Sequence, residues 1–223
     1  MTSGNLKAPG GTLLALTLLG AVTTTPSAEP AAADLDAKVL IAQLAKPAPA
    51  TIDFTEVRFS PLLKQPVMVS GTLGYTGPTT LDRHVTQPYR EDTEIRGESV
   101  RVRRDGEAER SFALKRAPEL QGLLTAFTSL LAGDHSAVDR TFKIAATGNH
   151  DTWQIALTPR DARMSKRVKQ IRIEGRSDVP RCFSILNDND GASMMLLGAA
   201  THTELPQPLT RDWLVRFCSQ PQE

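Results

Sequence analysis

Short stretches in which apolar and polar residues alternate dominate the sequence from residue 54 onward. Residues 67–76 and 99–104 alternate strictly, and Asp105-Gly106 then leads into another alternating stretch at residues 110–115. Alternation at every second residue is typical of strands with one buried face, and an Asp-Gly pair favours the tight turn of a hairpin. The pattern predicts a meander of antiparallel strands rather than alternating βαβ units.

The same reasoning applied to the whole chain predicts about ten or eleven strands. The alternation at residues 54–59 is imperfect, which indicates a β-bulge in that strand. Beyond the three stretches already named, the expected strands cover residues 54–59, 142–146, 153–157, 171–173, 182–186, 192–197 and 214–218.

Two segments have the spacing of amphipathic helices instead. Residues 34–46 place leucines and alanines on one stripe, with Asp34 as the expected N-cap and Pro47 as the stop. The second helix begins at Pro118, carries a wide apolar face, and is expected to end at Gly133. Two apolar helix faces need a sheet to cover. We therefore expect an α+β domain in which a single curved antiparallel β-sheet is covered by helices.

Residues 1–33 have the organisation of an export signal. Lys7 gives a weak positive start, residues 12–22 are apolar, and Ala31, Ala32 and Ala33 are small residues at the expected cleavage site. We predict a cleaved signal peptide at 1–33 and one domain at 34–223. Cleavage after Ala28, a short N-terminal anchor and a buried helix are the alternatives.

The chain contains two cysteines, Cys182 and Cys218. After export both would lie in an oxidising compartment, where they could form a disulfide that closes a long loop. Two separately buried thiols are the alternative. Because no histidine lies near either cysteine, we expect no metal site.

Composition and charge exclude further classes. The 223 residues include 26 Lys and Arg against 25 Asp and Glu, a net charge of +1, which argues against a nucleic-acid partner. No apolar stretch reaches the ~18 residues of a membrane-spanning helix. One local excess of positive charge could contact an acidic partner or anionic lipid, or could be the solvated face of a hairpin. It consists of Arg160, Arg163, Lys166, Arg167, Lys169, Arg172 and Arg176.

No motif for catalysis or cofactor binding is present: the sequence lacks Gly-x-Ser-x-Gly, His-Glu-x-x-His, a P-loop and a dinucleotide fingerprint. We therefore expect neither enzymatic activity nor a cofactor, and we name no catalytic residue. An enzyme acting on a lipid intermediate is the alternative, with His84 or His150 beside a carboxylate in a cavity. A structural or interaction protein of the envelope is another, and it predicts no cavity of ~300 Å³ or more.

The order of these segments resembles the LolA family of periplasmic lipoprotein carriers. The resemblance covers most of the chain after residue 53. It is carried by Phe54-Thr55-Glu56, Gly71-Thr72-Leu73-Gly74-Tyr75, Pro78, Leu81, Pro88, Tyr89, Glu91, Trp153-Gln154-Ile155-Ala156-Leu157-Thr158-Pro159, Val168 to Ile173, and the turn from Asp188 to Gly191.

This resemblance implies an incomplete β-barrel, LolA/LolB-like, closed by helices around a hydrophobic cavity for acyl chains. It further implies a monomeric periplasmic carrier that moves a lipoprotein, lipid or lipid-linked product from the inner toward the outer membrane of a Gram-negative envelope. The implied partners are the acylated ligand, an inner-membrane donor protein and an outer-membrane acceptor protein, with transient contact with the membrane surface.

The resemblance also suggests residues for the site. The expected cavity residues are Val69, Leu73, Tyr75, Leu81, Leu124, Phe127 and Trp153. In the family an arginine usually precedes the proline that follows the Gly-Thr-Leu strand and helps to hold the helices closed. Here Gly77 precedes Pro78, and Arg83 is the candidate substitute for this helix-latching role. The difference favours the LolA-related branch, whose members resemble carriers of other lipids or pigments.

Overall fold

The computed structural model describes Met1, residues 35–187 and residues 189–220. The predicted signal peptide beyond Met1, its cleavage site and Asp34 lie outside the described residues. The chain divides into two units, Met1–Ala31 and Ala32–Glu223, and every element below belongs to the second.

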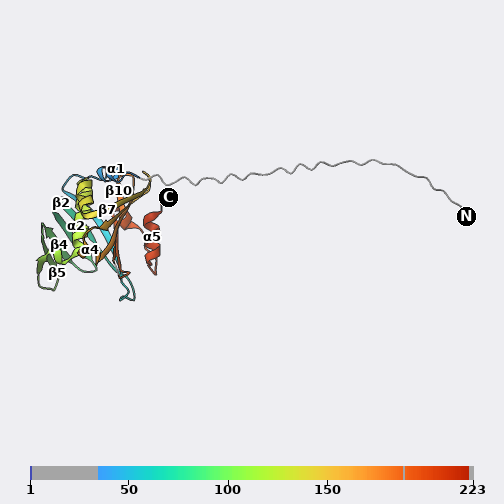
Figure 1. The fold of residues 1–223 in the computed structure, drawn as a ribbon. Helices are drawn as coiled ribbons and strands as arrows, with labels where there is room; N and C mark the ends of the chain where they lie inside the picture. Colours follow the sequence, from blue (N-terminus) through green and yellow to red (C-terminus); the bar gives the residue numbers. More distant parts are fainter. Residues whose placement is uncertain (2–34, 188, 221–223) are drawn as a thin grey trace. The chain divides into compact units, whose positions relative to one another are not determined.

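One antiparallel sheet of eleven strands forms this unit, in the order β6-β5-β4-β3-β2-β1-β11-β10-β9-β8-β7 (Figure 1). The sheet is open, with β6 and β7 at its edges, so the expected single antiparallel sheet covered by helices is confirmed. The strands are β1 (Ala50–Phe59), β2 (Val67–Gly77), β3 (Thr80–Gln87), β4 (Glu91–Arg96), β5 (Ser99–Arg104), β6 (Arg110–Ala113), β7 (Phe142–Gly148), β8 (Trp153–Pro159), β9 (Val168–Arg176), β10 (Val179–Asn187) and β11 (Ala192–Leu197).

The helices cover both faces of the sheet (Figure 1). They are α1 (Ala37–Gln43), η1 (Leu114–Arg116), α2 (Pro118–Leu131), α3 (His135–Thr141), α4 (Ala162–Ser165), η2 (Gly198–His202) and α5 (Arg211–Ser219). None of the described helices is long and apolar enough to cross a membrane. The helix start at Pro118 is confirmed, and Gly133, with a φ of 65°, lies just past its end.

The first helix begins later than predicted. Its N-cap is Asp36, whose carboxylate accepts a hydrogen bond from the backbone N–H of Lys38 at 2.8 Å. The expectation of Asp34 as the cap is therefore wrong. Both aspartates precede the same apolar stripe, and the pattern alone did not distinguish them.

The expected strand at residues 214–218 is wrong, because this segment lies in helix α5. Thr210 caps the helix by accepting a hydrogen bond from the backbone N–H of Trp213 at 3.2 Å. The rings of Trp213 and Phe217, four residues apart, stack with centroids 5.2 Å apart. An apolar stretch of five residues is compatible with both the helical and the strand period, so the residues around it decide which structure forms.

Strand β1 contains no bulge, since its pairing with β2 and β11 runs without a register shift. Its alternation is imperfect because the four consecutive residues from Phe54 to Val57 are all buried. Phe54 packs into the core on the inner face of the sheet, with α1 and α2, whereas Val57 packs into the core on the outer face, with α5. A strand covered on both sides does not alternate.

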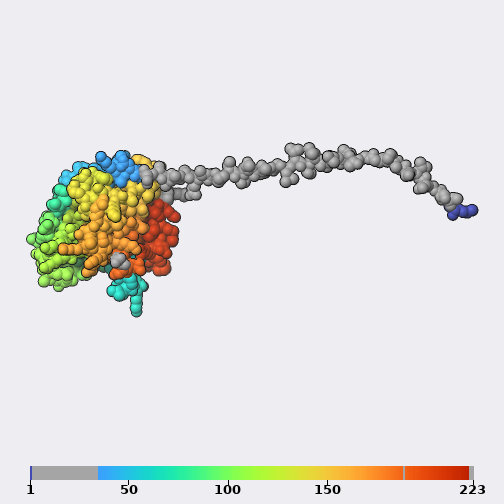
Figure 2. All heavy atoms as spheres, viewed as in Figure 1, coloured from blue at the N-terminus to red at the C-terminus, as the bar shows by residue number. Residues whose placement is uncertain are grey.

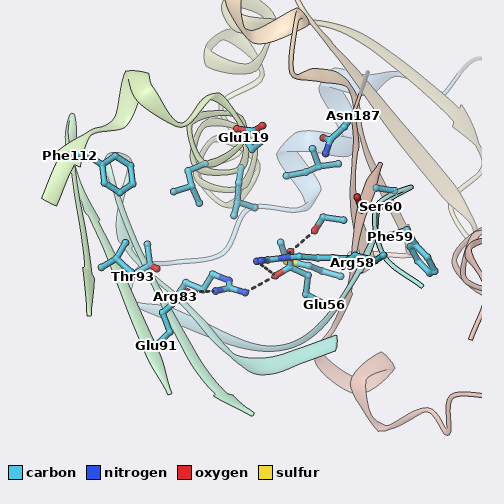
Figure 3. Close-up of a pocket in the computed structure, with 18 of the residues that line it drawn as sticks. Glu56, Arg58, Phe59, Ser60, Arg83, Glu91, Thr93, Phe112, Glu119 and Asn187 are labelled. Carbon is cyan, nitrogen blue, oxygen red and sulfur yellow. Dashed lines mark hydrogen bonds and ion pairs between the residues drawn. The ribbon is translucent and has the colours of Figure 1, made fainter. Parts of the chain in front are cut away.

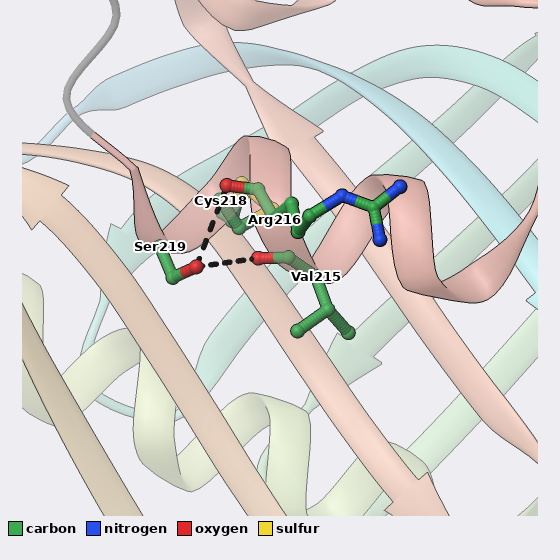
Figure 4. Close-up of a disulfide and its surroundings, with 5 residues drawn as sticks. Val215, Arg216, Cys218 and Ser219 are labelled. Carbon is green, nitrogen blue, oxygen red and sulfur yellow. Dashed lines mark hydrogen bonds between the residues drawn. A yellow bond between two sulfur atoms is a disulfide. The ribbon is translucent and has the colours of Figure 1, made fainter.

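Helix α5 is attached covalently to the outer face. Cys182 of β10 and Cys218 of α5 form a disulfide with an S–S distance of 2.10 Å, so they are not two separate thiols (Figure 4). Ser219, the next residue, donates its hydroxyl to the carbonyl oxygen of Val215 at 2.9 Å. On the chain-entropy model, a loop of this length stabilises the fold by about 3–4 kcal/mol.

Candidate functional site

A cavity of about 550 Å³ lies between the first turns of α2 and the inner face of the sheet (Figure 3). This volume falls within the range of small-ligand pockets. It also exceeds ~300 Å³, whereas the alternative of a structural or interaction protein predicts no cavity of that size. Its apolar lining consists of Phe59, Leu63, Val102, Phe112, Leu120, Leu123, Ile185, Ala192 and Met195, and its polar lining of Glu56, Arg58, Ser60, Arg83, Glu91, Thr93, Arg110, Glu119, Asn187 and Ser193.

The floor of the cavity carries a buried ion pair. Arg83 Nη2 lies 2.6 Å from Glu56 Oε2, and both residues are almost fully buried. Arg58 adds a two-pronged contact to the same carboxylate, with Nε at 2.7 Å from Oε1 and Nη2 at 2.9 Å from Oε2. The hydroxyl of Ser193 donates to Glu56 Oε1 at 2.5 Å. The carboxylate of Glu56 thus accepts four hydrogen bonds, which compensates for its removal from water.

The strand register explains why these charged groups meet. Glu56 is paired with Val69 of β2, and Arg83 is paired with Leu73 of the same strand. Alternate residues of a strand share a face, so both charged side chains lie on the inner face, on either side of Gly71. Strand β3 approaches β2 so closely at Gly71 that a Cβ atom there would lie 1.8 Å from the carbonyl oxygen of His84. Only glycine fits this position.

Arg83 is held from three directions. Its Nη1 lies 3.4 Å from Glu91 Oε1, in addition to the contact with Glu56, and its guanidinium lies 4.9 Å from the ring centroid of Phe54. Both carboxylate partners lie on strands, β1 and β4. The ion pairs of Arg83 therefore join strands of the sheet, whereas the predicted latching role would have it hold the helices.

The environment of Glu56 fixes its charge. Burial raises the pKa of this carboxyl, but the hydrogen bond and charge of Arg58, the charge of Arg83 and the hydroxyl of Ser193 together lower it to about 2. Glu56 is therefore ionised at neutral pH. The lining as a whole carries three carboxylates and three guanidiniums and is balanced in charge. Such a cavity provides an apolar wall opposite a polar floor whose charges are already paired.

The seven residues predicted for the cavity are all buried, and all belong to the inner core. None of them lines the main cavity. Leu124 borders a second crevice of about 380 Å³, and Leu73 and Phe127 border a third of about 400 Å³ near the end of α1. Trp153 borders a smaller crevice of about 200 Å³. All seven are therefore core residues, and four of them also border smaller openings.

The histidines lie elsewhere. His84 Nδ1 is 2.7 Å from Asp92 Oδ1, and both side chains are about half exposed. His150 lies 3.7 Å from Asp151 at an exposed turn. Among the described residues that line the main cavity there is no histidine, so the arrangement that the alternative enzyme hypothesis requires is not found there. No group of three or more potential metal ligands occurs in the described part of the chain.

Sequence reasoning missed the residues that define the cavity. Leu120 and Leu123 belong to the apolar stripe of the second helix, but the stripe does not indicate which of its members face empty space. Glu56 carried a clearer signal, because it is a carboxylate inside a stretch predicted as a strand, between Phe54 and Val57. Polar groups at such positions need a buried partner.

An open antiparallel sheet wrapped around a helix, with a cavity between the two, defines a half-barrel binding protein. The sequence identifies the family: the model described as "Outer membrane lipoprotein carrier protein LolA-like" matches residues 28–218. The chain belongs to this LolA-like family, as the sequence resemblance predicted. The family is one of carrier-type binding proteins.

The solved structures that match this chain have low sequence identity to it. A LolA superfamily protein from Nitrosomonas europaea is 9% identical over 78% of this chain and 96% of its own, with a TM-score of 0.39. The MucA/MucB complex of Pseudomonas aeruginosa matches at 14% identity over 81% of this chain and 60% of its own, with a TM-score of 0.37. No curated protein sequence is significantly similar to the chain.

Proposed function

We propose that this protein is a carrier that binds the acyl chains of an amphipathic ligand in the cavity between α2 and the sheet. The observation that carries the proposal is the cavity itself: its wall is formed by aliphatic and aromatic side chains, and its volume is about 550 Å³. Each methylene group moved from water into such a site stabilises the complex by about 0.8 kcal/mol. The affinity is therefore expected to rise with the length of the buried chain.

The polar floor favours an amphipathic ligand over a pure hydrocarbon. Arg58 is 46% exposed at its side chain and lies at the boundary between the apolar wall and the ion pair. A polar headgroup can hydrogen-bond there while its chains contact Leu120, Leu123 and Met195. Leu73, Leu124 and Phe127 are proposed as further contacts, because they border two of the smaller crevices.

Family membership supports the finer part of the proposal. The mature domain would begin at Asp34 after export to the periplasm, and it would carry a lipoprotein, lipid or lipid-linked product from the inner toward the outer membrane. It would receive the ligand from an inner-membrane donor and deliver it to an outer-membrane acceptor, without covalent chemistry.

Native mass spectrometry of the protein purified from a periplasmic extract tests this function directly. We expect an adduct in stoichiometric amount, and lipid extraction should identify it as acylated. A protein that shows only its own mass, before and after incubation with lipids and lipopeptides, would contradict the carrier function. The enzyme and the structural envelope protein would then be the better hypotheses.

A charge in the cavity wall should block binding. Leu120 is half-buried in the first turn of α2, where a glutamate suits the helix dipole, so Leu120→Glu is expected to fold. We expect its affinity for a fluorescent fatty acid to fall at least ~10-fold, because the carboxylate must lose water to admit the chain.

The matched control is Gln121→Glu, which adds the same charge in the same helical turn on an exposed side chain. It should bind the fatty acid like the wild type. Equal affinities of the two variants would show that the chain binds elsewhere.

A further inference from the structure

The exposed apolar residues of this protein are concentrated in one loop. Among the described residues, seven large hydrophobic side chains are exposed, and four of them lie at or beside the turn between β1 and β2. They are Leu62 (92% exposed), Leu63 (44%), Val67 (40%) and Met68 (47%). We call residues 60–68 the hairpin tip. In Figure 2 the segment between β1 and β2, coloured teal, projects from the neighbouring surface.

The hairpin tip is a defined turn that adjoins the cavity. The backbone N–H of Leu63 donates to the carbonyl oxygen of Ser60 at 3.0 Å, and that of Leu62 donates to the Ser60 hydroxyl at 3.3 Å. Ser60 and Leu63 also line the cavity, whereas Leu62 does not. A surface that contacted Leu62 would thus lie beside the cavity entrance.

Unpaired positive charge lies at the same end of the sheet. The register places the end of β1 beside the start of β11, the end of β10 and the start of β9. The turn before β9 is therefore separated from β1 by three strand spacings, roughly 15 Å. We call the four exposed cations of α4, of this turn and of the first residues of β9 the basic turn: Arg163, Lys166, Arg167 and Lys169. None of the four has an ion-pair partner in the described part of the chain.

The basic turn is anchored next to the cavity. Met164 of α4 is buried, and its sulfur would lie 3.8 Å from a Cβ atom on Gly122 of α2, the residue before Leu123. The carboxylate of Asp161 caps α4 by accepting two backbone N–H groups. Exposed Lys64 adds a further cation within the hairpin tip.

We propose that this end of the molecule docks on an anionic lipid membrane, with Leu62 inserted into the headgroup region and the basic turn against the phosphates. Apolar side chains flanked by unpaired lysines and arginines are the composition of interfacial membrane anchors. Docking there would place the cavity entrance at the bilayer. The purpose of this contact, loading or unloading an acyl chain, rests on the proposed function, but the contact itself does not.

Co-sedimentation with vesicles tests the docking. We expect the wild type to bind vesicles of phosphatidylethanolamine and phosphatidylglycerol, to bind phosphatidylcholine vesicles far more weakly, and to be released by salt. Leu62→Asp should lower the affinity at least ~10-fold, because it removes the inserted side chain. The double variant Lys166→Glu with Arg167→Glu should lower it by a similar factor.

The controls carry the same changes at the other end of the sheet. Val39→Asp replaces an exposed valine of α1, and Lys38→Glu reverses an exposed lysine of the same helix. Both should bind vesicles like the wild type. The docking proposal is wrong if the wild type does not bind the anionic vesicles, or if the controls lose as much affinity for them as the variants do.

A fatty-acid binding assay separates this inference from the proposed function. All these variants should bind the fluorescent fatty acid normally, because none of the substituted residues lines the cavity. Fatty-acid binding without vesicle binding would overturn the docking inference alone. Vesicle binding without fatty-acid binding would overturn the carrier function alone.

Discussion

Glu56→Gln is expected to lower the free energy of unfolding by about 3–5 kcal/mol, the loss typical of breaking a buried ion pair on one side. The substitution leaves Arg83 buried between a neutral amide and Glu91, with its contact of 2.6 Å to a carboxylate lost. For a chain of this size the melting temperature should fall by about 6–20 °C. Thermal and urea unfolding would measure both quantities.

Two further variants show whether the loss comes from the uncompensated charge. Glu94→Gln removes a carboxylate that pairs with the half-exposed Arg101 and Arg103, and should cost less than about 1 kcal/mol. Adding Arg83→Met to Glu56→Gln removes the orphaned charge and should recover most of the stability. If the double variant is no more stable than the single one, the pair is not the cause.

Acid titration gives an independent measure of the same carboxylate. Its pKa is lowered from 4.5 to about 2 in the folded protein, so its contribution is complete above pH 4.5 and is lost as the pH falls toward 2. The wild type should lose about 3 kcal/mol over this interval on account of Glu56. The Glu56→Gln variant should lack this part of the acid-induced loss.

Strands of the sheet could be predicted from the sequence where the residues on their inner face are apolar. Strands β3 and β4 were not predicted, because their inward positions include Arg83 and Glu91, and charged residues there remove the alternation. The same residues hold the ion pair beneath the cavity. The charged residues of the cavity floor are therefore also the reason why the strands that carry them were not predicted.

The cavity itself could not be predicted for a different reason. An apolar stripe such as that of α2 specifies which residues leave water, but packing decides which of them contact other side chains and which face a void. Leu123 lines the cavity, whereas its neighbour Leu124 faces the crevice on another side of the helix. The pair of Glu56 and Arg83 joins residues 27 positions apart, and only the strand register brings them together.

Glu174 should give the opposite pH dependence to Glu56. It lies on β9, paired with Cys182 of the disulfide and with Gln154 of β8, and it is 5% exposed. Its Oε2 is buried and has no hydrogen-bond partner among the described residues. Burial raises its pKa to about 7, although the charge of Arg172 opposes the shift.

A raised carboxyl pKa favours the protonated folded state, so the contribution of Glu174 is complete below pH 4.5 and is lost as the pH rises toward 7. We expect Glu174→Gln to be more stable than the wild type at pH 8, by about 3 kcal/mol, and equally stable at pH 4. Urea unfolding at both pH values measures the difference, with Glu94→Gln as the control that should show no such dependence.

Together the two carboxyls limit the pH range in which the wild type is most stable. Glu56 lowers stability below pH 4.5 and Glu174 lowers it above, so their combined contribution is greatest near the shared ordinary pKa of 4.5. In Glu174→Gln this maximum should broaden into a plateau that extends to neutral pH. A wild type whose stability is constant between pH 4.5 and 7 would mean that Glu174 finds water or a partner when it ionises.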